Sequence, residues 1–207
     1  MFEAIVKSTT SPRSLGSLLA CLALLVLSTG LDLATKNWAL DRLSHPASVA
    51  PGPVCEANDD GLVYFQRIQR PPLVLIDGYL ELRYAENCGA AFGVLHGASR
   101  WLRLALFGPA ALAATLGLLW LYFRGYGGRL FAISVPLIAS GAIGNLIDRF
   151  RLGYVVDFIR FHVRDAFVWP TFNVADCTIT VGVALLVIEG FTAPKPSAAE
   201  TPQRASN

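Results

Sequence analysis

Charged side chains are scarce in this chain of 207 residues, where Asp, Glu, Lys and Arg together make up 15% of the sequence. A soluble domain carries about 25%. Because 54% of the residues are hydrophobic and several apolar runs are long, the shortage of charge indicates an integral membrane protein. The formal net charge of +2 gives no reason to expect a nucleic-acid partner.

The chain also lacks the residue patterns that bind metals. Its histidines are scattered, and its cysteines form no CxxC pair and no zinc spacing, so we expect neither a metal nor a cofactor. Cys21 and Cys177 fall in apolar segments and are most simply buried small hydrophobes. The sequence leaves open whether Cys55 and Cys88 pair.

Four apolar segments are long enough to cross a membrane as helices, which takes about 20 residues. They run approximately from Leu15 to Leu33, Leu102 to Phe123, Leu130 to Ile147 and Val174 to Phe191. The short turn at 124–129 predicts that the second and third spans are antiparallel neighbours. An even number of spans puts both termini on one side, but the distribution of Lys and Arg does not decide which side.

Two regions outside the spans have their own character. The segment 40–100 is mixed and proline-rich, and within it Leu73–Tyr84 is typical of extended strand interrupted at Asp77-Gly78. The tail 193–207 is rich in Pro, Ala, Ser and Thr, which predicts disorder. We therefore expect a single domain over residues 1–192.

Two aspartates, Asp157 and Asp176, lie at the ends of very apolar segments. A carboxylate at membrane depth costs roughly 2.5–3.5 kcal/mol on insertion scales, so such residues suggest a functional site. On neighbouring segments they suggest a pair that shares one proton, as in aspartic proteases. Each taken singly is more simply a surface charge or, for Asp176, the cap of the fourth span.

Further polar residues collect at the same end of the spans. Asn145 and Asp148 are three positions apart and share one helix face, and Arg149 follows directly. Gly141 and Gly144 on the same span favour close helix contact. Other members of this polar group are Asn87 and Gly89 before the second span, Asn173 before the fourth, and Asp32 with Lys36 at the end of the first. Taken alone, the Asp32–Lys36 pair is more simply a boundary ion pair than a catalytic one.

With these residues the chain resembles a known family, the lipoprotein signal peptidases or signal peptidase II. Five motifs carry the resemblance, in the family's order and from the first span to the fourth. They are Asp32-x-x-x-Lys36, Asn87-x-Gly89-Ala90-Ala91-Phe92-Gly93, Gly144-Asn145-x-x-Asp148-Arg149, Val155-Val156-Asp157-Phe158 and Phe172-Asn173-x-Ala175-Asp176. The chain departs from the family in its long tail and in apparent extra sequence from Pro46 to Gln69.

The resemblance implies an all-α membrane protein of four transmembrane helices with a small extracytoplasmic β-rich element and a loop or helix lid. It implies an aspartyl endopeptidase of the bacterial inner membrane that needs no cofactor. Its termini would be cytoplasmic and its active site would lie at the outer face. The catalytic aspartates would be Asp157 and Asp176. Substrate-binding and supporting roles would fall on Asn87, Gly89, Asn145, Asp148, Arg149, Asn173, Asp32 and Lys36. The partners would be lipidated prolipoproteins and membrane lipid, and we expect a monomer.

The residues alone leave two other classes of function open. A proton-coupled transporter or channel would spread ionisable residues through the depth of its spans and often shows repeated halves. Here residues 104–119 carry no charge, and no internal repeat is visible. A membrane scaffold without enzymatic activity would explain the small-residue seams but gives no reason for the two aspartates.

Overall fold

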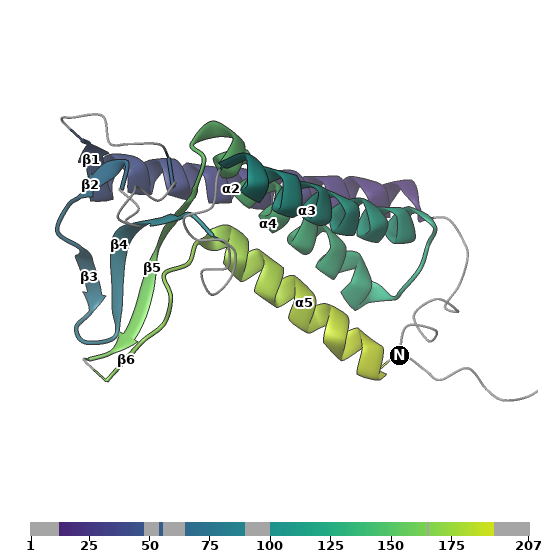
Figure 1. Ribbon diagram of the computed structural model, residues 1–207. Helices are drawn as coiled ribbons and strands as arrows, with labels where there is room; N and C mark the ends of the chain where they lie inside the picture. Colours follow the sequence, from purple (N-terminus) through teal and green to yellow (C-terminus); the bar gives the residue numbers. More distant parts are fainter. Residues whose placement is uncertain (1–12, 48–53, 56–64, 90–99, 165, 193–207) are drawn as a thin grey trace, which may run out of the picture.

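The computed structural model describes residues 13–47, 54–55, 65–89, 100–164 and 166–192. These residues form a bundle of four helices with two small antiparallel sheets at one end (Figure 1). The residues Ala90 to Gly93 of the second motif and the tail predicted to be disordered lie outside the described residues.

The helices follow the four apolar segments of the sequence. Their bounds are α2 (Leu15–Leu43), α3 (Arg100–Phe123), α4 (Arg129–Arg151) and α5 (Val174–Thr192). Three of them, α2, α4 and α5, are long and apolar enough to cross a membrane, and α3 contributes a shorter apolar segment, Gly108–Phe123, among its described residues. Large side chains such as Leu22 and Phe191 are exposed on the helices, as expected for surfaces that face lipid.

Helix α2 is longer than the predicted span, because it continues ten residues past Leu33 and ends at Leu43. At 1.5 Å per residue it is roughly 43 Å long, which exceeds a hydrocarbon core of about 30 Å. The continuation holds Lys36, whose charge is balanced inside the bundle, as described below. The end of α2 therefore belongs to the same layer as the sheets.

Glycines bring α4 close to both α2 and α5, as the sequence predicts. A methyl group at Gly141 would collide with the carbonyl oxygen of Ala175, and one at Gly144 would collide with the carboxylate of Asp32. At the other end of the bundle, the carboxylate of Glu189 on α5 accepts hydrogen bonds from the backbone N–H groups of Gly128 and Phe131 at the start of α4. Helices α4 and α5 are thus joined at both ends.

The strands form a two-stranded sheet, β1-β2, and a four-stranded sheet in the order β3-β4-β5-β6. Their bounds are β1 (Ser44–Pro46), β2 (Arg67–Gln69), β3 (Leu73–Ile76), β4 (Leu80–Asn87), β5 (Val155–Val163) and β6 (Phe167–Val168). The turn between β3 and β4 is the predicted break, where Gly78 adopts a left-handed φ of 74°. Strand β5 was not predicted; it pairs with β4, so that Val155 lies opposite Asn87 and Asp157 opposite Ala85.

A buried cluster joins the end of α2 to the larger sheet, and a disulfide lies within it. Cys55 and Cys88 are bonded, with 5.4 Å between their Cα atoms, which settles a pairing that the sequence left open. Cys21 and Cys177 are free thiols; Cys21 is buried as expected, whereas Cys177 is only half-buried. The other buried members of the cluster are Ala39, Leu43, Tyr84, Tyr154, Val156 and Phe158.

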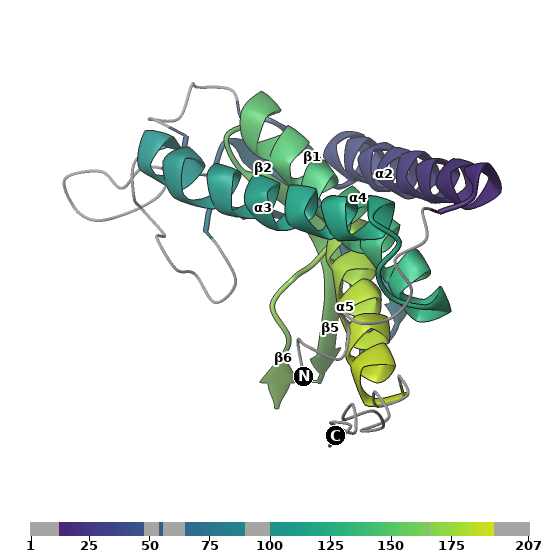
Figure 2. The same cartoon turned by 90° about the vertical axis from the view of Figure 1, so that its right-hand side faces the viewer.

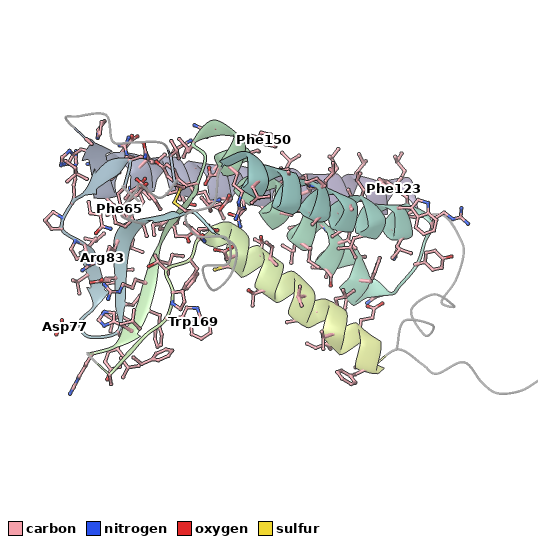
Figure 3. All side chains as sticks on the ribbon, in the orientation of Figure 1. Phe65, Asp77, Arg83, Phe123, Phe150 and Trp169 are labelled. Atoms are coloured by element: carbon pink, nitrogen blue, oxygen red, sulfur yellow. A yellow bond between two sulfur atoms is a disulfide. The ribbon has the colours of Figure 1, made fainter. Side chains whose placement is uncertain are left out.

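The two ends of the bundle differ in what they hold. The start of α2, the α3–α4 turn and the end of α5 lie together at the right of Figure 1, and both sheets lie at the left. A quarter turn of the molecule keeps the start of α5 beside β5 (Figure 2). Trp169, between β6 and α5, projects from the sheet on the side of α5 (Figure 3). The start of α5 and the end of α4 therefore meet the sheet at one place.

Candidate active site

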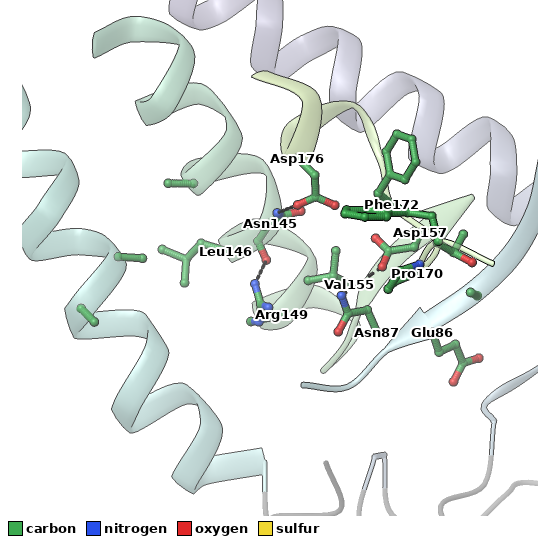
Figure 4. Close-up of a pocket in the computed structure, with 16 residues that line it drawn as sticks. Glu86, Asn87, Asn145, Leu146, Arg149, Val155, Asp157, Pro170, Phe172 and Asp176 are labelled. Atoms are coloured by element: carbon green, nitrogen blue, oxygen red, sulfur yellow. Dashed lines mark hydrogen bonds between the residues drawn. The ribbon is translucent and has the colours of Figure 1, made fainter. Parts of the chain in front are cut away.

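At this meeting place a cavity of about 790 Å³ is lined by both aspartates (Figure 4). Asp157 comes from β5, and Asp176 comes from the first turn of α5. The sequence motifs reach the cavity because β5 pairs with β4 while α4 and α5 pack against each other. Residues far apart in the chain therefore surround one pair of carboxylates.

Asp157 is buried, with 2% of its surface exposed, and both of its oxygens accept hydrogen bonds. The amide nitrogen of Asn87 lies 3.0 Å from Oδ2, and that of Asn173 lies 2.6 Å from Oδ1. Burial, and then repulsion from Asp176, raise the pKa of Asp157 to about 7 despite these two donors. A carboxyl group with that pKa carries a proton for much of the time near neutral pH.

Asp176 occupies a setting that stabilises negative charge. Its Oδ2 accepts the backbone N–H of Asn173 at 3.1 Å, and its own N–H donates to Oδ1 of Asn173 at 3.0 Å. This reciprocal pair caps helix α5, so the predicted capping role of Asp176 and its place at the cavity coexist. The partial positive charge of the helix N-terminus also favours a carboxylate there.

Two asparagines connect the carboxylates to each other. Asn173 donates from its side-chain nitrogen to the carboxyl group of Asp157 and from its backbone N–H to the carboxylate of Asp176. Asn145 donates from Nδ2 to Oδ1 of Asp176 at 2.9 Å and accepts at Oδ1 from Nζ of Lys36 at 2.8 Å. An ammonium group can only donate, so Lys36 fixes the amide of Asn145 with its nitrogen toward Asp176.

The predicted boundary ion pair is a buried network instead. Lys36 is 1% exposed, and its Nζ lies 2.9 Å from Asp32 and 3.2 Å from Asp148. Asp32 accepts the backbone N–H of Ala175 at 2.8 Å, and Asp148 accepts that of Val156 at 3.1 Å. These bonds hold the residues next to Asp176 and Asp157, so the network positions both segments that carry the aspartates.

Arg149 and Gly89 complete the set of predicted residues. The guanidinium of Arg149 lines the cavity and donates to the carbonyl oxygens of Asn145 and Gly89, each at 3.2 Å. The N–H of Gly89 in turn donates to Oδ1 of Asn87 at 3.2 Å. Five of the ten predicted residues line the cavity, namely Asn87, Asn145, Arg149, Asp157 and Asp176. Gly89, Asn173 and Lys36 each contact one of these five, and Asp32 and Asp148 contact Lys36.

Sequence reasoning missed much of the cavity wall. Ala110 and Ala111 of α3 line one side, and Trp169 and Phe172 line another. The alanines carry no signal that separates them from other apolar residues of a span. Glu86 also lines the cavity and was missed, although it precedes a singled-out residue, Asn87. Within the described residues, no group of three or more His, Cys, Asp or Glu side chains is arranged to hold a metal ion.

Comparison with known proteins gives consistent matches. The sequence model of the family described as Signal peptidase (SPase) II matches residues 23–192. A lipoprotein signal peptidase of Clostridium tetani is 36% identical over 165 residues, which are 80% of this chain and 88% of that protein. One of Ralstonia nicotianae is 46% identical over 114 residues, which are 55% of this chain but only 65% of that relative's length.

A solved structure described as a bacterial membrane enzyme is similar in fold. The TM-score is 0.63 at 21% sequence identity, and the match covers 93% of this chain and 100% of the other. At that identity the likeness concerns the fold.

Proposed function

This chain belongs to the signal peptidase II family, and from that membership we propose that it is a membrane-embedded aspartic endopeptidase. It would remove the signal peptide from prolipoproteins by cutting before a diacylglyceryl-modified cysteine. The observation that carries the proposal is the pair of carboxylates at the wall of a cavity, Asp157 and Asp176, which both accept hydrogen bonds from the buried Asn173.

We propose different roles for the two aspartates, and their surroundings support this division. Asp176, stabilised as an anion by the helix N-terminus and two donors, takes a proton from a water molecule that attacks the scissile carbonyl. Asp157, whose pKa is about 7, keeps its proton to polarise that carbonyl and later donates it to the leaving amine. Because the groups are coupled, the pair titrates as a unit.

The remaining polar groups of the cavity suit an extended peptide. Asn145 and Arg149 present amide and guanidinium donors, and Asn87 stands beside the carboxyl group of Asp157. The small side chains Ala110 and Ala111 leave room along α3 for apolar substrate parts. We infer that lipid chains of the substrate lie on this apolar side, which faces the bilayer.

The same proposal fixes the orientation in the bacterial inner membrane. All four helices would span it, with the termini and the α3–α4 turn in the cytoplasm and the sheets at the outer face. The disulfide Cys55–Cys88 supports this orientation, because disulfides persist in oxidising compartments and it lies at the sheet end of the molecule.

The test is cleavage of a purified lipidated prolipoprotein by the purified chain in lipid. Asp157→Asn and Asp176→Asn are expected to abolish cleavage while thermal unfolding remains cooperative. Asp41→Asn, at an exposed acid of α2, is the matched control and should cleave like the unmodified protein. Normal turnover by either active-site variant would refute the roles given to the aspartates.

A further inference from the structure

The extra sequence between α2 and β3 is attached on both sides of one active-site residue. We call residues 46–69 the insert; its described parts are Pro46 with Ala47, Val54 with Cys55, and residues 65–69, which include β2. One attachment is to Glu86 and another is to Cys88. Asn87, which donates to Asp157, lies between them.

The first attachment uses the side chain of Glu86. Its carboxylate accepts the backbone N–H groups of Gln66 at 2.8 Å and Arg67 at 2.9 Å, and the hydroxyl group of Tyr84 donates to it at 3.1 Å. Glu86 is 8% exposed, and burial raises its pKa above the ordinary value. The proposed reaction makes no use of this buried acid, although it lines the cavity.

The second attachment is the disulfide. Cys55 and Cys88 are both buried in the cluster that contains Tyr84 and Val156, so the bond links the insert to the core under the sheet. The bond closes a sequence separation of 33 residues. One of its two cysteines, Cys88, directly follows Asn87 in the chain.

The insert is in turn fixed to α2. Arg67 donates from Nε to the hydroxyl oxygen of Ser44 at 2.8 Å and from its terminal nitrogen to the carbonyl of Leu40 at 3.0 Å. Strands β1 and β2 pair over Ser44–Pro46 and Arg67–Gln69. The insert therefore connects the end of α2 to the end of β4 through several independent bonds.

Asn87 needs such support because it is the last residue of β4. Strand ends open more readily than strand centres. A small displacement there would separate Nδ2 of Asn87 from Oδ2 of Asp157, now 3.0 Å apart. We propose that the insert is a clamp, in which Glu86 and the Cys55–Cys88 disulfide are positioning residues that hold Asn87 against Asp157.

This proposal deepens the proposed function and rests on it, and it has a consequence for proton binding. The hydrogen bond from Asn87 lowers the pKa of Asp157, so a loosened Asn87 should raise that pKa. The other groups that act on Asp157 are Asp176 from α5, Asn173 before it, Arg149 from α4 and Lys36 from α2. Arg149 reaches the clamped end of β4 through the carbonyl oxygen of Gly89, whereas Asn87 donates to the carboxyl group of Asp157 itself. We therefore expect the effect of the clamp on the pKa of Asp157 to pass mainly through Asn87.

The experiment compares two independent ways to open the clamp. Cys55→Ala with Cys88→Ala removes the disulfide, and Glu86→Gln keeps the shape of the side chain but weakens its bonds to Gln66 and Arg67. Cys21→Ala, at a buried free thiol on α2, is the matched control. We expect kcat to fall roughly tenfold in both clamp variants, and the loss of activity with rising pH to move upward by about half a unit to one unit. The control should show neither change.

An Asn87→Ala background tests whether the effect passes through Asn87. In this background the clamp substitutions should cause almost no further shift in the pH at which activity is lost, because effects that act through one shared group are not additive. Full additivity in that background would overturn the proposal, as would a pH profile unchanged in Glu86→Gln. If the disulfide variant does not fold, the kcat and pH profile of Glu86→Gln alone test the proposal.

A second measurement keeps this proposal separate from the proposed function. Infrared titration of the protein, taken as the difference from Asp157→Asn, follows the proton of Asp157 without any substrate. If the unmodified protein fails to cleave prolipoprotein, the proposed peptidase function is refuted. The titration still tests separately whether the insert positions Asn87. An Asp157 titration midpoint in Glu86→Gln equal to that of the unmodified protein would refute the clamp.

Discussion

Replacing Lys36 with methionine would leave two buried carboxylates, those of Asp32 and Asp148, without the ammonium group that now lies 2.9 and 3.2 Å from them. Methionine nearly conserves the volume of lysine, so the change removes charge and hydrogen bonds rather than packing. Asn145 also loses the donor at 2.8 Å that fixes the orientation of its amide. The effect should therefore appear both in stability and at Asp176.

The magnitude follows from burial. Removing one partner of a buried ion pair costs about 3–5 kcal/mol, because the remaining charge has no compensation. Here the substitution leaves the carboxylates of Asp32 and Asp148 without an ammonium partner. Each still accepts one backbone N–H, from Ala175 and from Val156 respectively. We expect the free energy of unfolding of Lys36→Met to fall by about 3–5 kcal/mol.

Equilibrium unfolding in mixed micelles, followed by tryptophan fluorescence, measures this change. Arg42→Met, at an exposed position of the same helix, is the matched control and should stay within about 0.5 kcal/mol of the unmodified protein. Adding Asp32→Asn and Asp148→Asn to Lys36→Met should recover most of the loss, because no buried charge is then left unpaired. If Lys36→Met has the same free energy of unfolding as the control, the buried charge network does not stabilise the fold.

Two further predictions concern proton binding and packing. Burial raises the pKa of Asp157 to about 7, above its value in the unfolded chain, so its contribution to stability is fully present below about pH 4 and is lost as the pH rises through 7. Cleavage should decline over the upper part of that range as Asp157 loses its proton, and stability curves for Asp157→Asn should lack this dependence; a rate that stays flat up to pH 9 would contradict it. Gly144→Ala places a methyl group against the carboxylate of Asp32 and should lower the free energy of unfolding by about 1–3 kcal/mol. Gly117→Ala on α3, where a methyl group meets open space, should cause no such loss, and equal values for the two variants would refute the packing argument.

The sequence predicted the helical segments and the strand break well, because these depend on local pattern. Apolar length marks each helix, and Asp77-Gly78 marks the turn between β3 and β4. The end of α2 was misplaced because apolarity stops near Asp32, whereas the helix continues wherever its charges are neutralised by other elements. That neutralisation depends on Asp148, which is more than 100 residues away.

The sequence identified residues that the structure brings together at the candidate site, but not the bonds that connect them. The motifs named the residues that meet at the cavity, although their catalytic roles stay predictions. The burial of Lys36 and the bond between Cys55 and Cys88 depend on tertiary contacts that no local spacing reveals. Strand β5 was missed because its residues lie between two predicted spans, where no partner strand is evident from local sequence, despite their β-branched and aromatic character.

The attachment of α5 to α4 at both ends bears on how the proposed substrate, a lipid-bearing peptide, would reach the aspartates. Glu189 secures one end of the pair, and the bond from Asn145 to Asp176 secures the other, so these two helices should move as one body. Helix α3 makes its main described contact with α4 and contributes Ala110 and Ala111 to the cavity wall. Under the proposed function, we infer that a substrate would enter from the lipid phase by sideways displacement of α3.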